Sequence, residues 1–286
     1  MIYHALEKIM QLDLADRRLE PWIKRPMVKP AVESLAHARR VLIITGFCLG
    51  PELPETDGPL GAIVLGRALQ TMGAEVIYIC DSPVNRIIQA LIDAAKAPAR
   101  ILCLMPSFQA AAVLEELHPS HLIAIERPGR NRDGDYLNAR GLSVKSWNEP
   151  LDDLFLLPRG DWETLGIGDG GNEIGMGNVY AQLQARPDPF PRLATIVKVD
   201  HLITAGVSNW GAYALVAGLS LWHHRNLLHT AIEESQMLRA ALRGGAVDGF
   251  SLKSELSVDG ISLGIHQGVL RLFHQLIKEG LNRKES

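Results

Sequence analysis

The sequence predicts an α/β protein with a three-layer, doubly wound, mainly parallel sheet that carries helices on both faces. Four apolar runs rich in β-branched residues, at 40–46, 75–81, 100–105 and 121–127, lack the polar alternation of half-exposed strands. Segments with helical periodicity alternate with these runs, as expected for parallel βαβ units. The 286 residues are 47% hydrophobic and 21% charged, which is typical of a globular protein and excludes disorder.

The remaining elements follow from spacing and from helix-start signals. Pro59 occupies a first helical position, and apolar residues recur at helical spacing from there to Gly73. Further helices are expected up to residue 17 and at 31–38, 84–96, 172–184, 210–224, 233–243 and 264–280, and another follows the third strand and ends at Leu117. Further strands are expected at 164–168, 194–199 and 201–206.

Charge and composition exclude several classes of protein. Lys and Arg number 29 against 32 Asp and Glu, a net charge of −3, whereas nucleic-acid affinity comes largely from phosphate neutralisation. The uncharged stretch 202–222 is long enough to span a bilayer, but polar residues interrupt its first half, so we expect a buried strand, turn and helix. We therefore expect neither a nucleic-acid partner nor a membrane partner.

The chain is expected to form one unit in the cytoplasm. No repeat or convincing linker divides it, which predicts a single α/β domain over residues 1–286 with a helical extension at 1–34. Three cysteines form no C-x-x-C pair, and the acidic N-terminal segment lacks the apolar stretch of a signal peptide. Whether the domain forms a homo-oligomer is left open.

Four polar loops that follow strands are candidates for a ligand site, because ligands of open α/β sheets bind at the carboxyl ends of the strands. The first loop, 45–58, leads into a helix N-terminus, where free N–H groups favour an anion, but it has no P-loop pattern. Its candidate substrate-binding residues are Thr45, Gly46, Thr56 and Asp57. A simple helix cap is the alternative for Thr56, whereas Glu55 and Asp57 together exceed what a cap needs.

The second loop, 126–134, directly follows the fourth strand. Glu126 ends an apolar run, where it could serve as an acid, a base or a metal ligand. Arg127 and Arg130 follow, and arginine binds a carboxylate through two parallel hydrogen bonds. The alternative is a solvated turn with internal salt bridges.

The third loop is the richest in glycine, with six glycines among the twelve residues 166–177. Such density costs backbone entropy and indicates close backbone approach or positive φ. Asp169 and Glu173 are candidate catalytic or metal-binding residues, and the candidate substrate-binding residues are Gly170, Gly171, Asn172 and Asn178. The loop also contains G-x-G-x-x-G, but the acidic ribose contact expected about 20 residues later is poorly placed.

The fourth loop, 206–211, again lies between a strand and a helix. Ser208 and Asn209 are candidate substrate-binding residues, with a helix N-cap as the alternative. The absence of G-x-S-x-G argues against an acyl-enzyme. Asp259 precedes Gly260 in what is most simply a turn, with a smaller chance of reaching the site.

The four loops together resemble one known family. The runs at 55–62, 125–134, 166–178 and 205–215 are similar to those of the D-glutamate cyclase family, in its C-terminal domain. The resemblance covers roughly residues 35–280, and it implies a hydro-lyase that converts D-glutamate to 5-oxo-D-proline and water.

Such a cyclisation sets chemical requirements that the candidate residues can meet. The site needs a cationic clamp for the α-carboxylate, for which Arg127 and Arg130 are candidates, together with a base and an acid or metal. Asp169, Glu173 and Glu126 are the candidate catalytic residues. Carboxylates that share a cleft must relieve their repulsion by binding a proton or a cation, and oxygen ligands favour Mg²⁺ or Mn²⁺ on Asp169 and Glu173.

Alternatives to this function remain open. Any small amino-dicarboxylate would satisfy the same requirements, and the reaction requires no nucleotide. A nucleotide- or dinucleotide-dependent enzyme could instead use the Gly166–Gly171 turn. A non-catalytic domain that binds an acidic metabolite is a third alternative.

Overall fold

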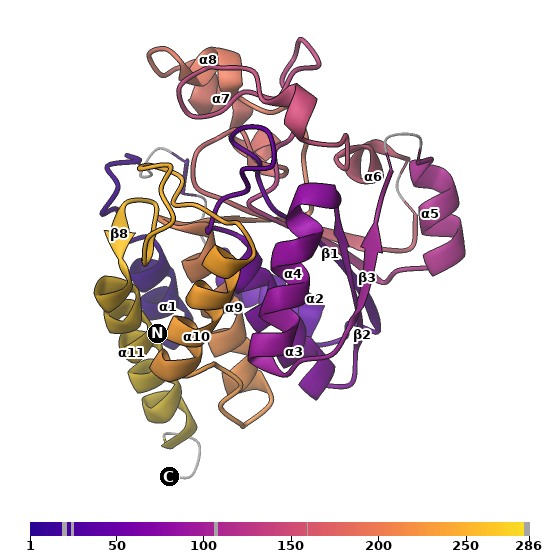
Figure 1. Ribbon diagram of the computed structural model, residues 1–286. Helices are drawn as coiled ribbons and strands as arrows, with labels where there is room; N and C mark the ends of the chain where they lie inside the picture. The colour runs from indigo at the N-terminus through magenta and orange to yellow at the C-terminus, as the bar shows by residue number, and fades with distance from the viewer. Residues whose placement is uncertain (19–21, 24–25, 106–107, 159, 283–286) are drawn as a thin grey trace.

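A six-stranded sheet, parallel throughout, forms the centre of the molecule (Figure 1). The computed structural model describes residues 1–286 except 19–21, 24–25, 106–107, 159 and 283–286. The strands are β1 (Arg40–Thr45), β2 (Glu75–Cys80), β3 (Arg100–Cys103), β4 (His121–Ile125), β5 (Glu163–Gly168) and β6 (His201–Thr204). Their order is β3-β2-β1-β4-β5-β6, so the four strands with the strongest sequence signal are neighbours.

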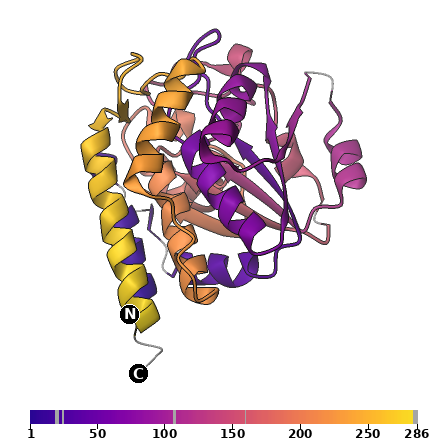
Figure 2. The ribbon, with the colours of Figure 1, turned by 60° about the horizontal axis from the view of Figure 1, so that its bottom comes forward.

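Two helical layers of unequal size cover the sheet, which confirms the predicted three-layer α/β fold. One face carries α2 (Val28–Leu35), α3 (Pro59–Thr71), α4 (Ser82–Ala95) and α9 (Ser208–Trp222). Outside them lie α1 (Ile2–Met10), α10 (Ala231–Arg243) and α11 (Leu263–Asn282), and Figure 2 shows α1 running behind α11. The opposite face packs on the smaller α5 (Ala110–Leu117) and α6 (Asp153–Leu156).

Alternate residues of each strand serve the two layers. Val41 and Ile43 of β1 belong to the large core under α3 and α9, whereas Leu42 and Ile44 belong to the smaller core under α5 and α6. All four side chains are fully buried. Burial on both faces explains why these strands read as continuous apolar runs.

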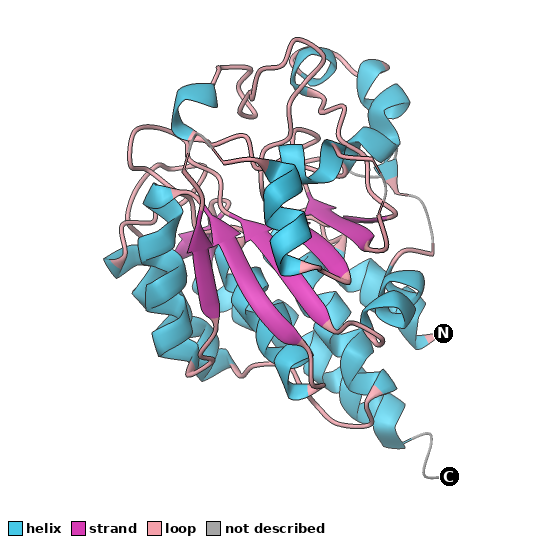
Figure 3. Ribbon diagram, turned by 90° about the vertical axis from the view of Figure 1, so that its right-hand side faces the viewer, coloured by secondary structure: helices cyan, strands magenta, loops and turns pink. Residues whose placement is uncertain are grey.

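The strand order reverses direction between β1 and β4, and this switch point decides where a ligand can bind. Chain connections leave β1 and β4 toward opposite sides, which opens a crevice at their carboxyl ends. Figure 3 shows the arrowheads of the strands pointing to the end of the molecule where the long loops gather. The short helices α7 (Tyr180–Gln184) and α8 (Phe190–Leu193) lie at this end, as does the hairpin of β7 (Ser257–Val258) and β8 (Ile261–Ser262).

Three expected elements differ from the structure. The first helix ends at Met10 and not near residue 17, so residues 11–18 run as an irregular segment. The helix expected at 172–184 begins only with a 3-10 turn at Met176–Val179, followed by α7. The strand expected at 194–199 is irregular, because its backbone pairs with loops instead: Val197 accepts from the N–H groups of Gly175 and Gly177.

None of the described helices is long and apolar enough to cross a membrane.

A glycine sets how closely α3 and α9 approach. A Cβ atom on Gly61 would lie 2.9 Å from Ala212 Cβ and 3.0 Å from Asn209 Cα. We predict that Gly61→Ala lowers the free energy of unfolding by about 1–3 kcal/mol, because the two helices must separate. Urea denaturation measures the change.

Gly268→Ala is the matched control in α11. Its Cβ would meet only the Arg271 side chain, at 3.9 Å, so the helix should gain up to about 1 kcal/mol. Equal effects of the two substitutions would show that helix propensity, and not the approach of α3 to α9, governs both sites.

Candidate functional site

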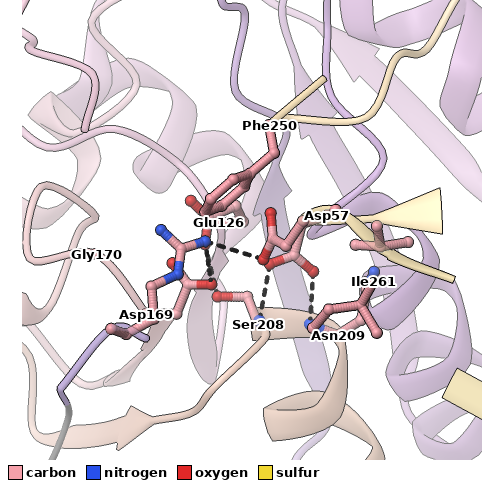
Figure 4. A network of polar contacts seen from close by, with 12 residues as sticks. Asp57, Glu126, Asp169, Gly170, Ser208, Asn209, Phe250 and Ile261 are labelled. Atoms are coloured by element: carbon pink, nitrogen blue, oxygen red, sulfur yellow. Dashed lines mark hydrogen bonds and ion pairs between the residues drawn. The ribbon is translucent and has the colours of Figure 1, made fainter. Parts of the chain in front are cut away.

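Six acidic side chains are buried together at the carboxyl ends of β1, β4 and β5. This acidic cluster consists of Glu55, Asp57, Glu126, Asp169, Glu173 and Asp259. The members come from the loops after the three strands and from the turn between β7 and β8. Figure 4 shows Asp57, Glu126 and Asp169 converging beneath Phe250.

A small cavity of about 60 Å³ opens onto the cluster. Its lining comprises Arg17, Phe47, Leu49, Glu55, Glu126, Asn138, Ala139, Asp169, Asn172, Glu173, Gly249, Phe250 and Asp259. The volume suffices for a few water molecules. A larger ligand would have to displace one of the side chains at the rim.

Asp57 joins the N-termini of α3 and α9. Its carboxylate accepts hydrogen bonds from the backbone N–H groups of Ser208 (2.8 Å) and Asn209 (2.9 Å). In return, Asn209 Oδ1 accepts from the N–H groups of Gly58 (3.1 Å) and Gly61 (2.6 Å). Burial and the nearby Asp259 raise the pKa of Asp57 to about 8, although the two backbone hydrogen bonds oppose the shift.

Glu126 directly follows β4 and has a left-handed backbone, with φ of 44°. This conformation is uncommon for a non-glycine residue and is typical of functional sites. Ser208 Oγ donates a 2.6 Å hydrogen bond to Glu126 Oε2. Burial, followed by the charges of Glu173 and Asp169, raises the pKa of Glu126 well above its usual value.

The glycine-rich loop after β5 supplies Asp169 and Glu173. The two oxygens of Glu173 accept hydrogen bonds from the backbone N–H groups of Gly170 and Gly171, both at 2.8 Å. Burial raises the pKa of Asp169 well above its usual value, whereas Arg17 opposes the shift. One carboxylate oxygen each from Glu126, Asp169 and Glu173 lies within 4.8 Å of the other two, and Asp57, Asp169 and Asp259 form a similar group.

Arg17 is the cation within this cluster. Its Nη2 atom lies 3.0 Å from Asp169 Oδ2 and 3.0 Å from Asp259 Oδ2, and its guanidinium carbon lies 5.2 Å from the centre of the Phe250 ring. Burial lowers the pKa of Arg17, but Asp169 and Asp259 outweigh it, so the group stays charged.

The arginines expected to form a clamp lie elsewhere. Arg127 is fully buried against Asp81 (2.7 Å) and donates to the backbone oxygens of Gly46 and Glu149. Arg130 binds Asp152 through two nitrogens, at 2.8 and 2.9 Å, and also pairs with Asp153. Both side chains hold loops together, and we do not assign the clamp to them.

Of the remaining candidate residues, some line the cavity or lie close to it, and one lies elsewhere. Asn172 lines the cavity, and its amide nitrogen donates to the Leu137 carbonyl. Thr45 is buried at the end of β1, and Thr56 donates to the Ser257 carbonyl. Asn178 lies away from the cluster, where it pairs with the backbone of Val199 through both amide atoms.

The G-x-G-x-x-G pattern does not form a phosphate loop. Gly166 and Gly168 lie within β5, and a Cβ on Gly166 would be 2.5 Å from the Ile174 oxygen. The lack of side chains at Gly166 and Gly168 leaves space for the segment around Glu173 and Ile174, which packs against β5. The stretch that follows Gly171 is not a helix N-terminus.

Comparison with known proteins adds the family. The family described as "D-glutamate cyclase-like, C-terminal" matches residues 6–274. The human protein named "D-glutamate cyclase, mitochondrial" is 35% identical over 256 residues, which cover 83% of this chain. The chain belongs to the D-glutamate cyclase-like, C-terminal family. It spans 41% of the length of the human relative.

The range matched by the family includes most of the N-terminal segment. The matched range begins at residue 6 and therefore includes Arg17, which belongs to the segment 1–34 that was expected to form a helical extension. No local pattern marks Arg17, because the run Asp16-Arg17-Arg18 resembles any exposed charged turn. For Asp259, the only indication in the sequence was its position before Gly260 in an expected turn. No sequence pattern indicated Phe250 as a site residue.

The buried pair of Arg127 and Asp81 gives a test of the role of Arg127 in this cyclase-like domain. We predict that Arg127→Met lowers the free energy of unfolding by about 3–5 kcal/mol, since Asp81 would remain buried without its partner. The double variant Arg127→Met/Asp81→Leu should recover most of the loss. If Arg127→Met is as stable as the wild type in urea, Arg127 is free for another role.

The raised carboxyl pKa values predict how stability depends on pH. Folded Asp57 keeps its proton up to pH of about 8, whereas an unfolded aspartate releases it near 3.8. Rising pH across this window therefore favours the unfolded chain, by up to about 1.4 kcal/mol per pH unit for one group. Asp57→Asn removes this contribution.

Urea denaturation of both proteins at pH 5, 6.5 and 8, with a chelator present, checks the sign. The stability of the wild type relative to Asp57→Asn should decrease as the pH rises. An increase over the same range would mean that Asp57 is ionised in the folded protein.

Proposed function

We propose that this chain catalyses the cyclisation of D-glutamate to 5-oxo-D-proline with loss of water, as a hydro-lyase. The observation that carries the proposal is the buried group of Glu126, Asp169 and Glu173, whose oxygens lie within 4.8 Å of one another. The family relationship supports D-glutamate as the substrate, since the human relative is named a D-glutamate cyclase. The expected ligand is thus a small amino-dicarboxylate.

The reaction forms one bond and breaks another. The α-nitrogen attacks the γ-carboxyl carbon, a C–N bond forms, and one γ-oxygen leaves as water. The ammonium group must give up one proton before the attack and a second one after it, and the departing γ-carboxylate oxygen must gain both protons to leave as water. The site therefore needs a base and an acid that do not neutralise each other.

The surroundings of Glu126 and Asp169 suggest how the two roles divide. Burial raises the pKa of Glu126, and the nearest charges, those of Glu173 and Asp169, raise it further, so Glu126 is suited to keep a proton and donate it to the departing oxygen. Burial raises the pKa of Asp169 as well, but Arg17 lies against it, opposes this rise and favours the ionised form. Asp169 is therefore the proposed base for the amine.

Glu173 and Ser208 hold these two residues in position. Glu173 fixes the glycine turn that carries Asp169, through the N–H groups of Gly170 and Gly171. Ser208 Oγ orients Glu126 through the hydrogen bond to Oε2. These contacts hold the proposed proton donor, Glu126, and the proposed acceptor, Asp169, so that both face the same small cavity.

The same oxygens fit a divalent cation such as Mg²⁺ or Mn²⁺. Such ions prefer carboxylate oxygens, and Glu126, Asp169 and Glu173 offer three that lie close together and share excess negative charge. When bound, the ion would polarise the γ-carboxyl group. Asp169 and Glu173 are the proposed ligands of this ion, a role for Asp169 that is the alternative to its role as the base.

Turnover of the separate enantiomers tests the proposal. Purified protein is incubated with D- or L-glutamate, after chelation and with or without Mn²⁺ or Mg²⁺, and 5-oxoproline is separated by chiral chromatography. We expect product from D-glutamate only. Asp169→Asn should reduce kcat by about 100-fold or more, the usual contribution of a positioned acid or base.

The exposed Asp161 supplies the control, since Asp161→Asn removes the same charge outside the site and should leave kcat unchanged. Full turnover by both Asp169→Asn and Glu173→Gln in the presence of chelator would refute the catalytic and metal assignments together. Tight binding of D-glutamate with no product would favour a non-catalytic binding domain.

A further inference from the structure

The cation that would bind the substrate's α-carboxylate comes from an unexpected part of the chain. We propose that Arg17, in the segment between α1 and α2, is the residue that binds this carboxylate. The inference rests on the proposed function and adds the group that selects the substrate.

Charge balance gives the first argument. Of the described residues that line the cavity, Arg17 alone carries positive charge, whereas Glu55, Glu126, Asp169, Glu173 and Asp259 are acidic. An amino-dicarboxylate has a net negative charge at neutral pH and would be repelled by such a lining. A guanidinium group at the cavity makes its entry electrostatically favourable.

Unused donor capacity gives the second argument. Both ion pairs of Arg17, to Asp169 and Asp259, use Nη2. Its Nε atom is buried and has no hydrogen-bond partner among the described residues. A guanidinium group carries five N–H donors in a planar fork that matches a carboxylate, so Arg17 can bind one through Nε without releasing either aspartate.

The chain around Arg17 is held in place, which gives the third argument. Asp13 accepts hydrogen bonds from the backbone N–H groups of Arg17 and Arg18, both at 2.6 Å. Arg186 donates to the carbonyl oxygens of the same two residues. The segment is tethered at its start, where the Gly206 N–H donates to the Met10 carbonyl at 2.8 Å. A preorganised arginine loses less entropy when it binds a ligand.

Arg17 and Phe250 together bound the opening of the site. The ring of Phe250 is 49% exposed and lies over the guanidinium group. Because the cavity holds only about 60 Å³, the Phe250 ring must move outward as the substrate enters, while Arg17 keeps its ion pairs to Asp169 and Asp259. The α-carboxylate would then contact Arg17 at the rim, and the γ-carboxyl group would reach Glu126 at the floor.

A comparison of two substrates isolates the contact. D-Glutamate and its α-amide differ in the carboxylate assigned to Arg17, and both retain the amine and the γ-carboxyl group. We measure kcat and KM for each with the wild type, Arg17→Ala and Arg17→Lys. Arg18→Ala is the matched control, because the Arg18 side chain is 70% exposed and its ion pair among the described residues is with the exposed Asp16.

We expect the wild type to prefer D-glutamate over the α-amide by about 10- to 100-fold in kcat/KM, as for one charge-assisted contact. Arg17→Ala should raise KM for D-glutamate by a similar factor and turn over the two substrates alike, within about threefold. Arg17→Lys should be intermediate, and added guanidinium chloride at millimolar concentration should partly restore Arg17→Ala. Arg18→Ala should behave as the wild type.

A purely structural role for Arg17 predicts a different result: Arg17→Ala would slow both substrates equally and retain the wild-type preference, which would overturn the inference. Circular dichroism and calorimetric titration with D-glutamate accompany the kinetics. A wild type that binds D-glutamate without turnover refutes the proposed function, and Arg17 is then judged by whether Arg17→Ala loses that binding. A folded wild type that neither binds nor converts D-glutamate overturns both.

Discussion

Among the described residues, six carboxyl groups are buried around the guanidinium of Arg17, and this burial is the constraint on which the rest of the structure depends. Charges removed from water are costly unless they are paired, hydrogen-bonded or neutralised by a proton. The protein uses all three means: Arg17 pairs with Asp169 and Asp259, backbone N–H groups bind Asp57 and Glu173, and burial raises the pKa of Glu126. The raised pKa of Glu126 and the ion pair of Asp169 with Arg17 also suit these two residues to the proposed roles of proton donor and proton acceptor.

The arrangement of the sheet makes this concentration of charge feasible. At the switch point between β1 and β4 the connections diverge, so loops from several strands reach one place without filling it. Helix N-termini also point there, and the first N–H groups of α9 donate hydrogen bonds to Asp57. Asn209 then ties α3 to α9, so that the large core and the site support each other.

The family relationship and the geometry answer different questions. The match to the D-glutamate cyclase-like family covers residues 6–274, a range that contains every member of the acidic cluster and Arg17. The human relative is longer, and this chain spans 41% of it. The relationship supports the proposed substrate, whereas the contacts support the proposed roles of the side chains that would hold it and move its protons.

The sequence by itself determined the parallel sheet and brought Glu126, Asp169 and Asp57 into consideration, because strand runs and the polar residues after them are local patterns of a few residues. Only the tertiary structure decided the partners of the charges. In the folded chain Arg127 is buried against Asp81. Arg17 lies in the acidic cluster beside Asp169, although the two residues are 152 positions apart in the sequence. An arginine pairs with whichever carboxylate the fold brings within reach, and no local pattern encodes that distance.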